Sequence, residues 1–330
     1  MDTALVSTAK ALVAPGKGIL AADESFSTIE KRFKSIGVES TEGSRRAYRE
    51  LLFTTPGVEE YISGIIMFDE TLRLASLAQG KPSAEILKER GIIPGIKVDR
   101  GTEELPGNPG EKITKGIEGL AERLREYQTL GAKFSKWRAV YNIIANTPSL
   151  EAVEKNNVLL AEFALISQQE GFVPIVEPEV LMDGDHDIDK CYEVTRTVLK
   201  MLFTKLKEKS VDLSSLLLKP NMILPGKDNP DKAEPAIVAQ KTLEVLKDVV
   251  PPEVPGIVFL SGGQTPDEAT GNLREMNKIG GVVWQLSFSF GRALQEPVLK
   301  AWAGREENKK AAQDVFLARA KMNSEARYGK

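Results

Sequence analysis

The segment LLLKPN (216–221) places a lysine where a buried strand should end. Three leucines predict a strand interior, and Pro220 cannot donate to a sheet ladder, so the strand should stop at Lys219. An unpaired buried ammonium is costly, so a lysine at this position calls for a chemical reason. A lysine amine is a nucleophile only when deprotonated, a state that desolvation and neighbouring cations both favour. Such an amine can attack a ketone, and the protonated Schiff base is an electron sink for cleaving the adjacent C–C bond.

This chemistry needs further groups, and the ends of other apolar segments supply candidates. Loss of water from the carbinolamine requires a general acid/base, for which Glu177 is the best placed candidate. A second base must take the proton from the hydroxyl whose C–O bond becomes a carbonyl, and Asp23 is the candidate. Lys136 can supply the neighbouring cation, and Glu179 can orient the lysines or hold their charge. The alternative is a purely structural network of ion pairs.

The chain alternates eight short apolar or β-branched segments with longer amphipathic stretches. The short segments are residues 16–24, 61–70, 92–101, 131–138, 171–179, 215–221, 256–264 and 282–292. Helices are predicted over 156–171 and 191–210, and another begins at a Thr cap at 265. Alternating β and α units predict a single catalytic (β/α)8 TIM barrel over residues 1–330, and a doubly wound open sheet is the alternative.

Most of the eight segments finish on a charged or hydroxyl residue. In a barrel, the C-terminal ends of the strands converge on one mouth, where active sites lie. The bases expected there outnumber the acids Asp23, Glu177 and Glu179; they are Lys97, Lys136, Arg138, Lys219 and Arg292. A basic pocket in a protein of net charge −3 favours an anionic ligand, and two separated basic clusters suit a phosphate at each end. The SGG segment (261–263) can offer a hydroxyl and backbone N–H groups to one phosphate.

The composition argues against several other classes of function. The pI is about 5.6 and no stretch concentrates Lys and Arg, so we expect neither a nucleic-acid nor a membrane partner. The chain has one His and one Cys, which argues against a zinc site, and we expect no metal or other cofactor. A lone Cys191 cannot form an intrachain disulfide, which fits a reducing, cytoplasmic compartment. No signal peptide is expected at the N-terminus.

Eight motifs in order along nearly the whole chain resemble class I fructose-bisphosphate aldolases. They are GKGILAADES, GIKVD, KWR, VPIVEPE, DGDHDI, LLKPNM, PGIVFLSGGQ and FSFGRALQ. The resemblance implies a (β/α)8 barrel and metal-independent, reversible cleavage of fructose 1,6-bisphosphate to dihydroxyacetone phosphate and glyceraldehyde 3-phosphate. This lyase reaction belongs to glycolysis, gluconeogenesis or the Calvin cycle. The resemblance also implies a homo-oligomer, since most animal and plant members are homotetramers.

The resemblance also implies roles for individual residues. Lys219 becomes the Schiff-base lysine, Glu177 the acid/base for imine formation with Glu179 beside it, and Asp23 the group that handles the proton of C–C cleavage. Lys136 contacts both the chemistry and the substrate. The phosphate of the ketone half is expected at Ser261, Gly262, Gly263, Ser289, Gly291 and Arg292. The other phosphate is expected at Ser25, Thr28, Arg32 and Lys97, and Arg138 is expected close to Lys136.

The sequence departs from the family's usual pattern beside Asp23. In ESFSTIEKR, Phe26 and Ser27 replace a small residue and a glycine, while Thr28 keeps a hydroxyl. The departure leaves open a Schiff-base lyase that prefers another phosphorylated ketose, such as fructose 1-phosphate. A catalytically idle barrel that serves as an interaction scaffold is the alternative outside enzymes. The chain ends at SEARYGK, whereas many relatives continue into a tail that ends in tyrosine, and we do not assign that role to Tyr328.

Overall fold

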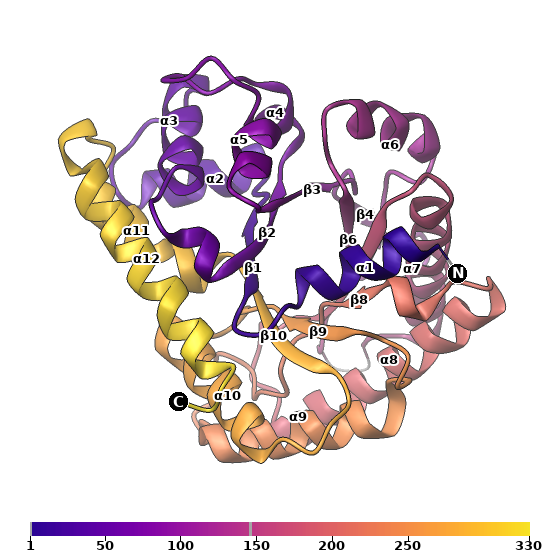
Figure 1. The fold of residues 1–330 in the computed structure, drawn as a ribbon. Coiled ribbons are helices and arrows are strands. Elements are labelled where there is room, and N and C mark those ends of the chain that lie inside the picture. The colour runs from indigo at the N-terminus through magenta and orange to yellow at the C-terminus, as the bar shows by residue number, and fades with distance from the viewer. Residues whose placement is uncertain (1, 145–146) are drawn as a thin grey trace.

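The strands of the protein close on themselves. We describe it from a computed structural model that covers residues 2–144 and 147–330. Within those residues, eight parallel strands form a closed barrel in the order β1-β2-β3-β6-β7-β8-β9-β10 (Figure 1). They are β1 (Gly18–Ala22), β2 (Ile62–Met67), β3 (Ile93–Lys97), β6 (Phe134–Tyr141), β7 (Val173–Val180), β8 (Leu217–Leu218), β9 (Gly256–Phe259) and β10 (Gln285–Phe290). Each overlaps one predicted segment, so the (β/α)8 TIM barrel is confirmed and the open-sheet alternative is wrong.

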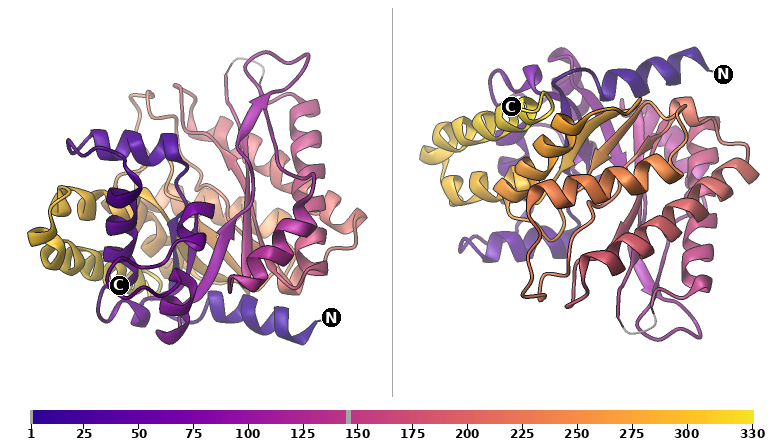
Figure 2. Two further views of the ribbon diagram at one scale, coloured as in Figure 1. Left: turned by 90° about the horizontal axis from the view of Figure 1, so that it is seen from above. Right: turned by 90° about the horizontal axis from the view of Figure 1, so that it is seen from below.

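Helices surround the barrel (Figures 1 and 2). They are α2 (Phe26–Lys34), α3 (Glu42–Phe53), α4 (Asp69–Arg73), α5 (Ser83–Glu89), α6 (Leu120–Thr129), α7 (Leu150–Gln169), α8 (Ile188–Glu208), α9 (Pro235–Val249), α10 (Pro266–Ile279), α11 (Arg292–Trp302) and α12 (Lys309–Ala326). The helices predicted over 156–171 and 191–210 begin earlier than expected, because Ser149 and Asp187 cap the first turns of α7 and α8. None of the helices in the described part of the chain has both the length and the apolar character needed to cross a membrane.

One end of the barrel is sealed by apolar packing. Helix α1 (Thr3–Leu12) lies against inward-facing residues near the starts of the strands, including Ile19, Phe134, Val173 and Leu217. These residues form a core inside the barrel, separate from the larger core between the strands and the outer helices. The other end of the barrel, where the strands finish, carries the polar side chains.

The chain leaves β8 at the predicted lysine. The backbone N–H of Lys219 donates to the Val176 carbonyl at 2.9 Å, and Pro220 then offers no N–H to continue the ladder. One hairpin was not predicted: β4 (Thr102–Glu104) pairs with β5 (Lys112–Thr114) in the loop after β3. Its strands have only three residues each and β4 is fully exposed, so no apolar alternation marks them in the sequence.

Candidate active site

The C-terminal ends of the strands surround a cavity of about 940 Å³. Every predicted site residue except Gly263 lines it: Asp23, Ser25, Thr28, Arg32, Lys97, Lys136, Arg138, Glu177, Glu179, Lys219, Ser261, Gly262, Ser289, Gly291 and Arg292. Among the described residues, nine basic and seven acidic side chains line the cavity. The predicted excess of two positive charges is therefore present, within a larger set of charged side chains than the sequence indicated.

Strand geometry explains why the catalytic candidates face one another. Alternate residues of a strand point to the same side, so Lys136 and Arg138 on β6 both face inward, as do Glu177 and Glu179 on β7. The parallel pairing of β6 and β7 places Arg138 beside Glu177. Lys219 follows β8, the next strand around the barrel.

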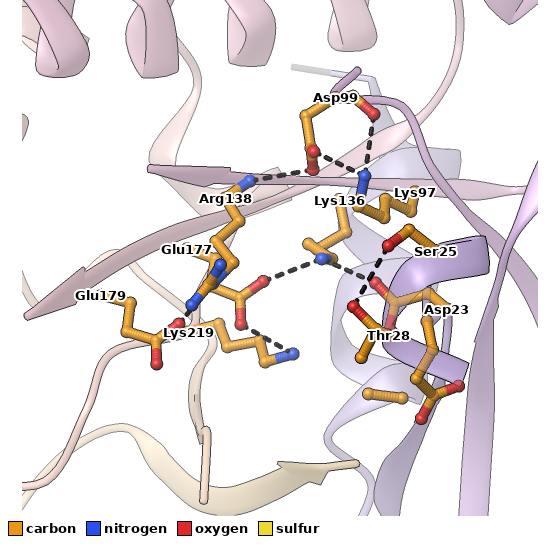
Figure 3. A network of polar contacts seen from close by, with 12 residues as sticks. Asp23, Ser25, Thr28, Lys97, Asp99, Lys136, Arg138, Glu177, Glu179 and Lys219 are labelled. Atoms are coloured by element: carbon orange, nitrogen blue, oxygen red, sulfur yellow. Dashed lines mark hydrogen bonds and ion pairs between the residues drawn. The ribbon is translucent and has the colours of Figure 1, made fainter. Parts of the chain in front are cut away.

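Three buried side chains and the partly buried Asp23 form a connected chain of ion pairs (Figure 3). Lys136 Nζ lies 2.6 Å from Asp23 Oδ2 and 3.0 Å from Glu177 Oε2. The other carboxylate oxygen of Glu177 lies 3.0 Å from Lys219 Nζ. Glu177 therefore bridges the two lysines, and each of the three side chains is at most 5% exposed.

The charged groups of this cluster shift the pKa values of Asp23, Glu177 and Lys136 toward the charged forms. Burial raises the pKa of the Asp23 carboxyl, but Lys136 and Lys219 outweigh it and bring that pKa well below its usual value. The pKa of Glu177 is lowered in the same way, against burial, by Lys136, Lys219 and Arg138. Burial lowers the pKa of Lys136, but Asp23 and Glu177 raise it by more. Both carboxylates and the Lys136 ammonium are therefore charged at neutral pH.

The position of Glu177 corrects one expectation. The sequence predicted that the Lys136 cation would be the neighbour that favours a deprotonated Lys219 amine. Instead, the Glu177 carboxylate lies between the two lysines, so the ion-pair partner of Lys219 is a carboxylate and not the expected cation. The same contact offers a route to the neutral amine, because the carboxylate is within hydrogen-bond reach to accept the lysine's proton.

One wall of the cavity has the features of an anion site. The hydroxyl of Ser289 is buried and has no hydrogen-bond partner among the described residues. Gly291 and Arg292 begin helix α11, and the Ser261 hydroxyl lies 3.4 Å from the Ala293 amide in its first turn. A backbone that opens a helix beside an unpaired hydroxyl and an arginine suits a phosphate.

Two details of this wall differ from the prediction. Gly263 has φ of +76° and its Cβ position would lie 2.5 Å from Met182, so it shapes the turn without reaching the cavity. The helix after SGG, α10, has its first turn satisfied by a capping box between Thr265 and Glu268. The helix that opens toward the cavity here is α11 instead.

The part of the cavity that follows β1 and β3 carries two hydroxyls and a paired lysine. The hydroxyls of Ser25 and Thr28 lie 3.1 Å apart at the start of α2 (Figure 3). Lys97 Nζ lies 2.5 Å from Asp99 Oδ1, so its charge is partly offset before any ligand arrives. Arg32, which was expected here, ion-pairs with Glu24, and its Nη2 lies 3.7 Å from where a Cβ would stand at Gly291. Arg32 therefore approaches the Ser289 and Gly291 wall.

Comparisons with known proteins agree with this geometry. A family model described as "Glycolytic: Fructose-bisphosphate aldolase class-I" matches residues 4–330. The chain belongs to the class I fructose-bisphosphate aldolase family. It is 53% identical over 326 residues to fructose-bisphosphate aldolase 4, cytosolic, of Arabidopsis thaliana, covering 98% of this chain and 83% of that one. It is 52% identical to a probable fructose-bisphosphate aldolase class 1 of Xanthomonas campestris, covering 99% of this chain and 98% of that one.

A solved structure of the aldolase family has the same fold. It is fructose-bisphosphate aldolase from Plasmodium falciparum in complex with TRAP and a small molecule inhibitor. The TM-score is 0.97 at 47% identity, covering 99% of this chain and 94% of that one.

Sequence reasoning missed several groups in this aldolase site. Glu24 is buried and pairs with Arg49 at 2.5 Å as well as with Arg32, and it accepts a hydrogen bond of 2.7 Å from Gln295. This network fixes Arg32 at the cavity wall. The cavity also extends beyond Asp99 to residues on α4, α6 and the loop after β3: Asp69, Arg73, Arg100, Arg123, Glu126 and Tyr127. No motif in the sequence marks this outer part.

The buried cluster predicts a pH-dependent loss of stability in Lys136→Met. In the unaltered protein, the lowered pKa values of Asp23 and Glu177 mean that their stabilisation is present above about pH 4 and is lost only as pH falls further. Loss of the Lys136 cation removes the largest contribution that lowers both pKa values, so both rise relative to the unaltered protein and acidification relieves part of the penalty. We expect a loss of about 3–5 kcal/mol in unfolding free energy at pH 7 and a clearly smaller loss at pH 5.

The measurement is urea unfolding of both proteins at the two pH values. Lys227→Met is a matched control, because it removes one partner of an exposed ion pair with Asp183 and should leave the unfolding midpoint unchanged. An equal loss at pH 7 and pH 5 for Lys136→Met would show that the carboxylates do not depend on this cation.

Proposed function

We propose that the protein is a metal-independent lyase that reversibly cleaves fructose 1,6-bisphosphate into dihydroxyacetone phosphate and glyceraldehyde 3-phosphate. The observation that carries the proposal is the Lys219 amine, buried in the cavity 3.0 Å from a carboxylate that also meets Lys136. Membership of the class I aldolase family supports the same reaction.

The first half of the proposed mechanism is capture of the ketone. Glu177 accepts a proton from the Lys219 ammonium, and the neutral amine adds to the substrate carbonyl. Glu177 then returns a proton to the carbinolamine hydroxyl, which leaves as water and creates the iminium. Because one carboxylate lies beside the nucleophile, the same group can serve both proton transfers.

The second half is cleavage of the C–C bond. Asp23 is ionised at neutral pH, so it can accept the proton of the substrate hydroxyl that becomes the aldehyde carbonyl. The bonding electrons pass into the iminium and form an enamine. Lys136 contacts both Asp23 and Glu177, so it stabilises each carboxylate while protons move. Protonation and hydrolysis of the enamine release the ketone product, and Glu179 holds Arg138 in an ion pair at the cavity wall.

The two walls of the cavity suit the two phosphates. We place the phosphate of the ketone half at Ser261, Gly262, Ser289, Gly291 and Arg292, where a buried hydroxyl lacks a partner among the described residues. The other phosphate then meets Ser25, Thr28 and Lys97. Arg32 lies close enough to Gly291 to assist the first site.

The Schiff base gives the proposal a direct test. Incubation with dihydroxyacetone phosphate and reduction with borohydride should leave a stable adduct on Lys219, mapped by mass spectrometry, and EDTA should not reduce its yield. Lys219→Arg should keep the charge and the fold but lose both the adduct and cleavage activity, because a guanidinium stays protonated. Adduct on another residue, or none, would contradict the proposed mechanism. An unaltered rate in the arginine variant would do the same.

We also propose that residues 1–330 act as one catalytic domain that assembles into a homotetramer in the cytoplasm. The two ends of the chain support one domain, because Arg327 donates to backbone carbonyls of Val13 and Leu286 at 3.2 and 3.1 Å. Relatives from Arabidopsis thaliana and Pisum sativum are named as cytosolic or cytoplasmic isozymes, which supports the location.

The tetramer predicts a solution mass of four chains. Light scattering after size exclusion should give about four times the 36.2 kDa of the chain, with the same value across a tenfold dilution. A mass of one or two chains would exclude the tetramer and leave the catalytic proposal unaffected.

A further inference from the structure

Phe26 occupies an unusual position beside the cavity. It is the first residue of α2 and stands in the sequence between Ser25 and Thr28, yet the residue is 51% exposed. An exposed phenylalanine contributes little to the core, so its contacts with neighbouring elements decide what it does.

Those contacts join three helices. The Phe26 ring meets Phe68 edge to face, with centroids 5.1 Å apart and an interplanar angle of 82°. The Arg45 guanidinium carbon lies 4.8 Å from the centroid of the same ring. Phe68 precedes α4 and lines the cavity, while Arg45 belongs to α3. The ring therefore links the start of α2 to the elements that follow it in the chain.

The arginine of this contact is itself held in place. Arg45 Nε donates to a Glu70 carboxylate oxygen at 2.8 Å, and its Nη1 donates to the Ser40 carbonyl at 2.9 Å. A fixed guanidinium loses little freedom when it lies over an aromatic face. Arg45 is therefore a fixed contact for Phe26, because Glu70 and Ser40 set its position independently of the ring.

The first turn of α2 needs such an anchor. The Ser25 hydroxyl makes no capping hydrogen bond within the described residues, and lies 3.1 and 3.3 Å from the hydroxyls of Thr28 and Ser27. Only backbone bonds from Thr28 and Ile29 to the Ser25 carbonyl, at 3.0 and 2.9 Å, close the turn. A helix end without a side-chain cap frays easily unless tertiary contacts hold it.

We propose that Phe26, clamped between Phe68 and Arg45, is a positioning residue that orients the Ser25 and Thr28 hydroxyls toward the phosphate distal to the reacting ketone. The inference rests on the proposed function and deepens it: the clamp makes the protein prefer a ketose bisphosphate over a ketose 1-phosphate. A sugar that lacks the distal phosphate does not meet these hydroxyls and gains nothing from their orientation.

The test is Phe26→Ala, assayed with fructose 1,6-bisphosphate and with fructose 1-phosphate. We expect KM for the bisphosphate to rise about five- to tenfold, the size of effect that aromatic and cation–π contacts provide, with kcat changed less than about twofold. KM for the monophosphate should change less than about twofold. Phe26→Tyr keeps the ring and should restore the bisphosphate KM.

Hydrogen exchange supplies a second readout that does not depend on activity. In Phe26→Ala, the amides of Thr28 and Ile29 should exchange about five- to tenfold faster than in the unaltered protein. Tyr328→Ala is the matched control, because it truncates another exposed aromatic with a cation nearby, Lys330 at 6.0 Å, and should change neither readout.

Each outcome decides between the possibilities. In Phe26→Ala, equal changes in KM for both sugars would contradict the proposed positioning role of Phe26. Unchanged hydrogen exchange at the Thr28 and Ile29 amides would do the same. If the unaltered protein cleaves neither sugar and traps no adduct at Lys219, the proposed function fails and the substrate preference falls with it. The exchange data would in that case still show whether Phe26 holds the turn.

Discussion

A single carboxylate, that of Glu177, holds two buried lysines at the mouth of the barrel. One oxygen meets Lys136 and the other meets Lys219, both at 3.0 Å. Charges removed from water in this way are tolerated only when each has a partner. Loss of any one member therefore leaves an uncompensated buried charge and strongly destabilises the fold. This constraint places the proposed nucleophile Lys219 and the Lys136 cation in contact with the proposed proton acceptor, Glu177, before any substrate arrives.

The barrel satisfies this constraint with very simple geometry. Asp23 and Lys219 lie just beyond the ends of β1 and β8, while Lys136 and Glu177 point into the barrel from within β6 and β7. Helix α1 seals the opposite end with apolar residues. The core that stabilises the fold and the polar mouth are therefore separated along the barrel axis. Charged groups can accumulate at the mouth without disturbing the packing that keeps the strands in register.

Much of this arrangement could be predicted from local sequence. A lysine between three leucines and a proline can only lie at the end of a buried strand, and polar residues two apart, as at Glu177 and Glu179, must face the same side. The eight-fold alternation then gave the barrel. What local pattern could not supply was the distance between strands, so the bridge made by Glu177 was missed and Lys136 was expected to act on Lys219 directly.

Other differences between the expected and the observed positions of side chains have the same origin. Gly263 was grouped with its neighbours in SGG, but it has a left-handed backbone and does not line the cavity. Arg32 was grouped with the start of α2, although its Nη2 also lies close to Gly291, which follows the neighbouring strand β10. The contacts of Phe26 come from residues 68 and 45, which only the folded chain brings near. The positions of these three residues depend on side-chain length and on the path of the folded chain, which residue type alone does not predict.

The central claim is that Glu177 carries out two proton transfers. It accepts the proton that leaves the Lys219 amine neutral, and it then protonates the carbinolamine hydroxyl that leaves as water. The most direct measurement is the single-turnover rate of imine formation with dihydroxyacetone phosphate in Glu177→Gln, compared with Glu179→Gln. Loss of a general acid/base costs about 10²–10⁴ in rate, so we expect that decrease for Glu177→Gln and less than about tenfold for Glu179→Gln. Imine formation at the unaltered rate in Glu177→Gln would contradict the account.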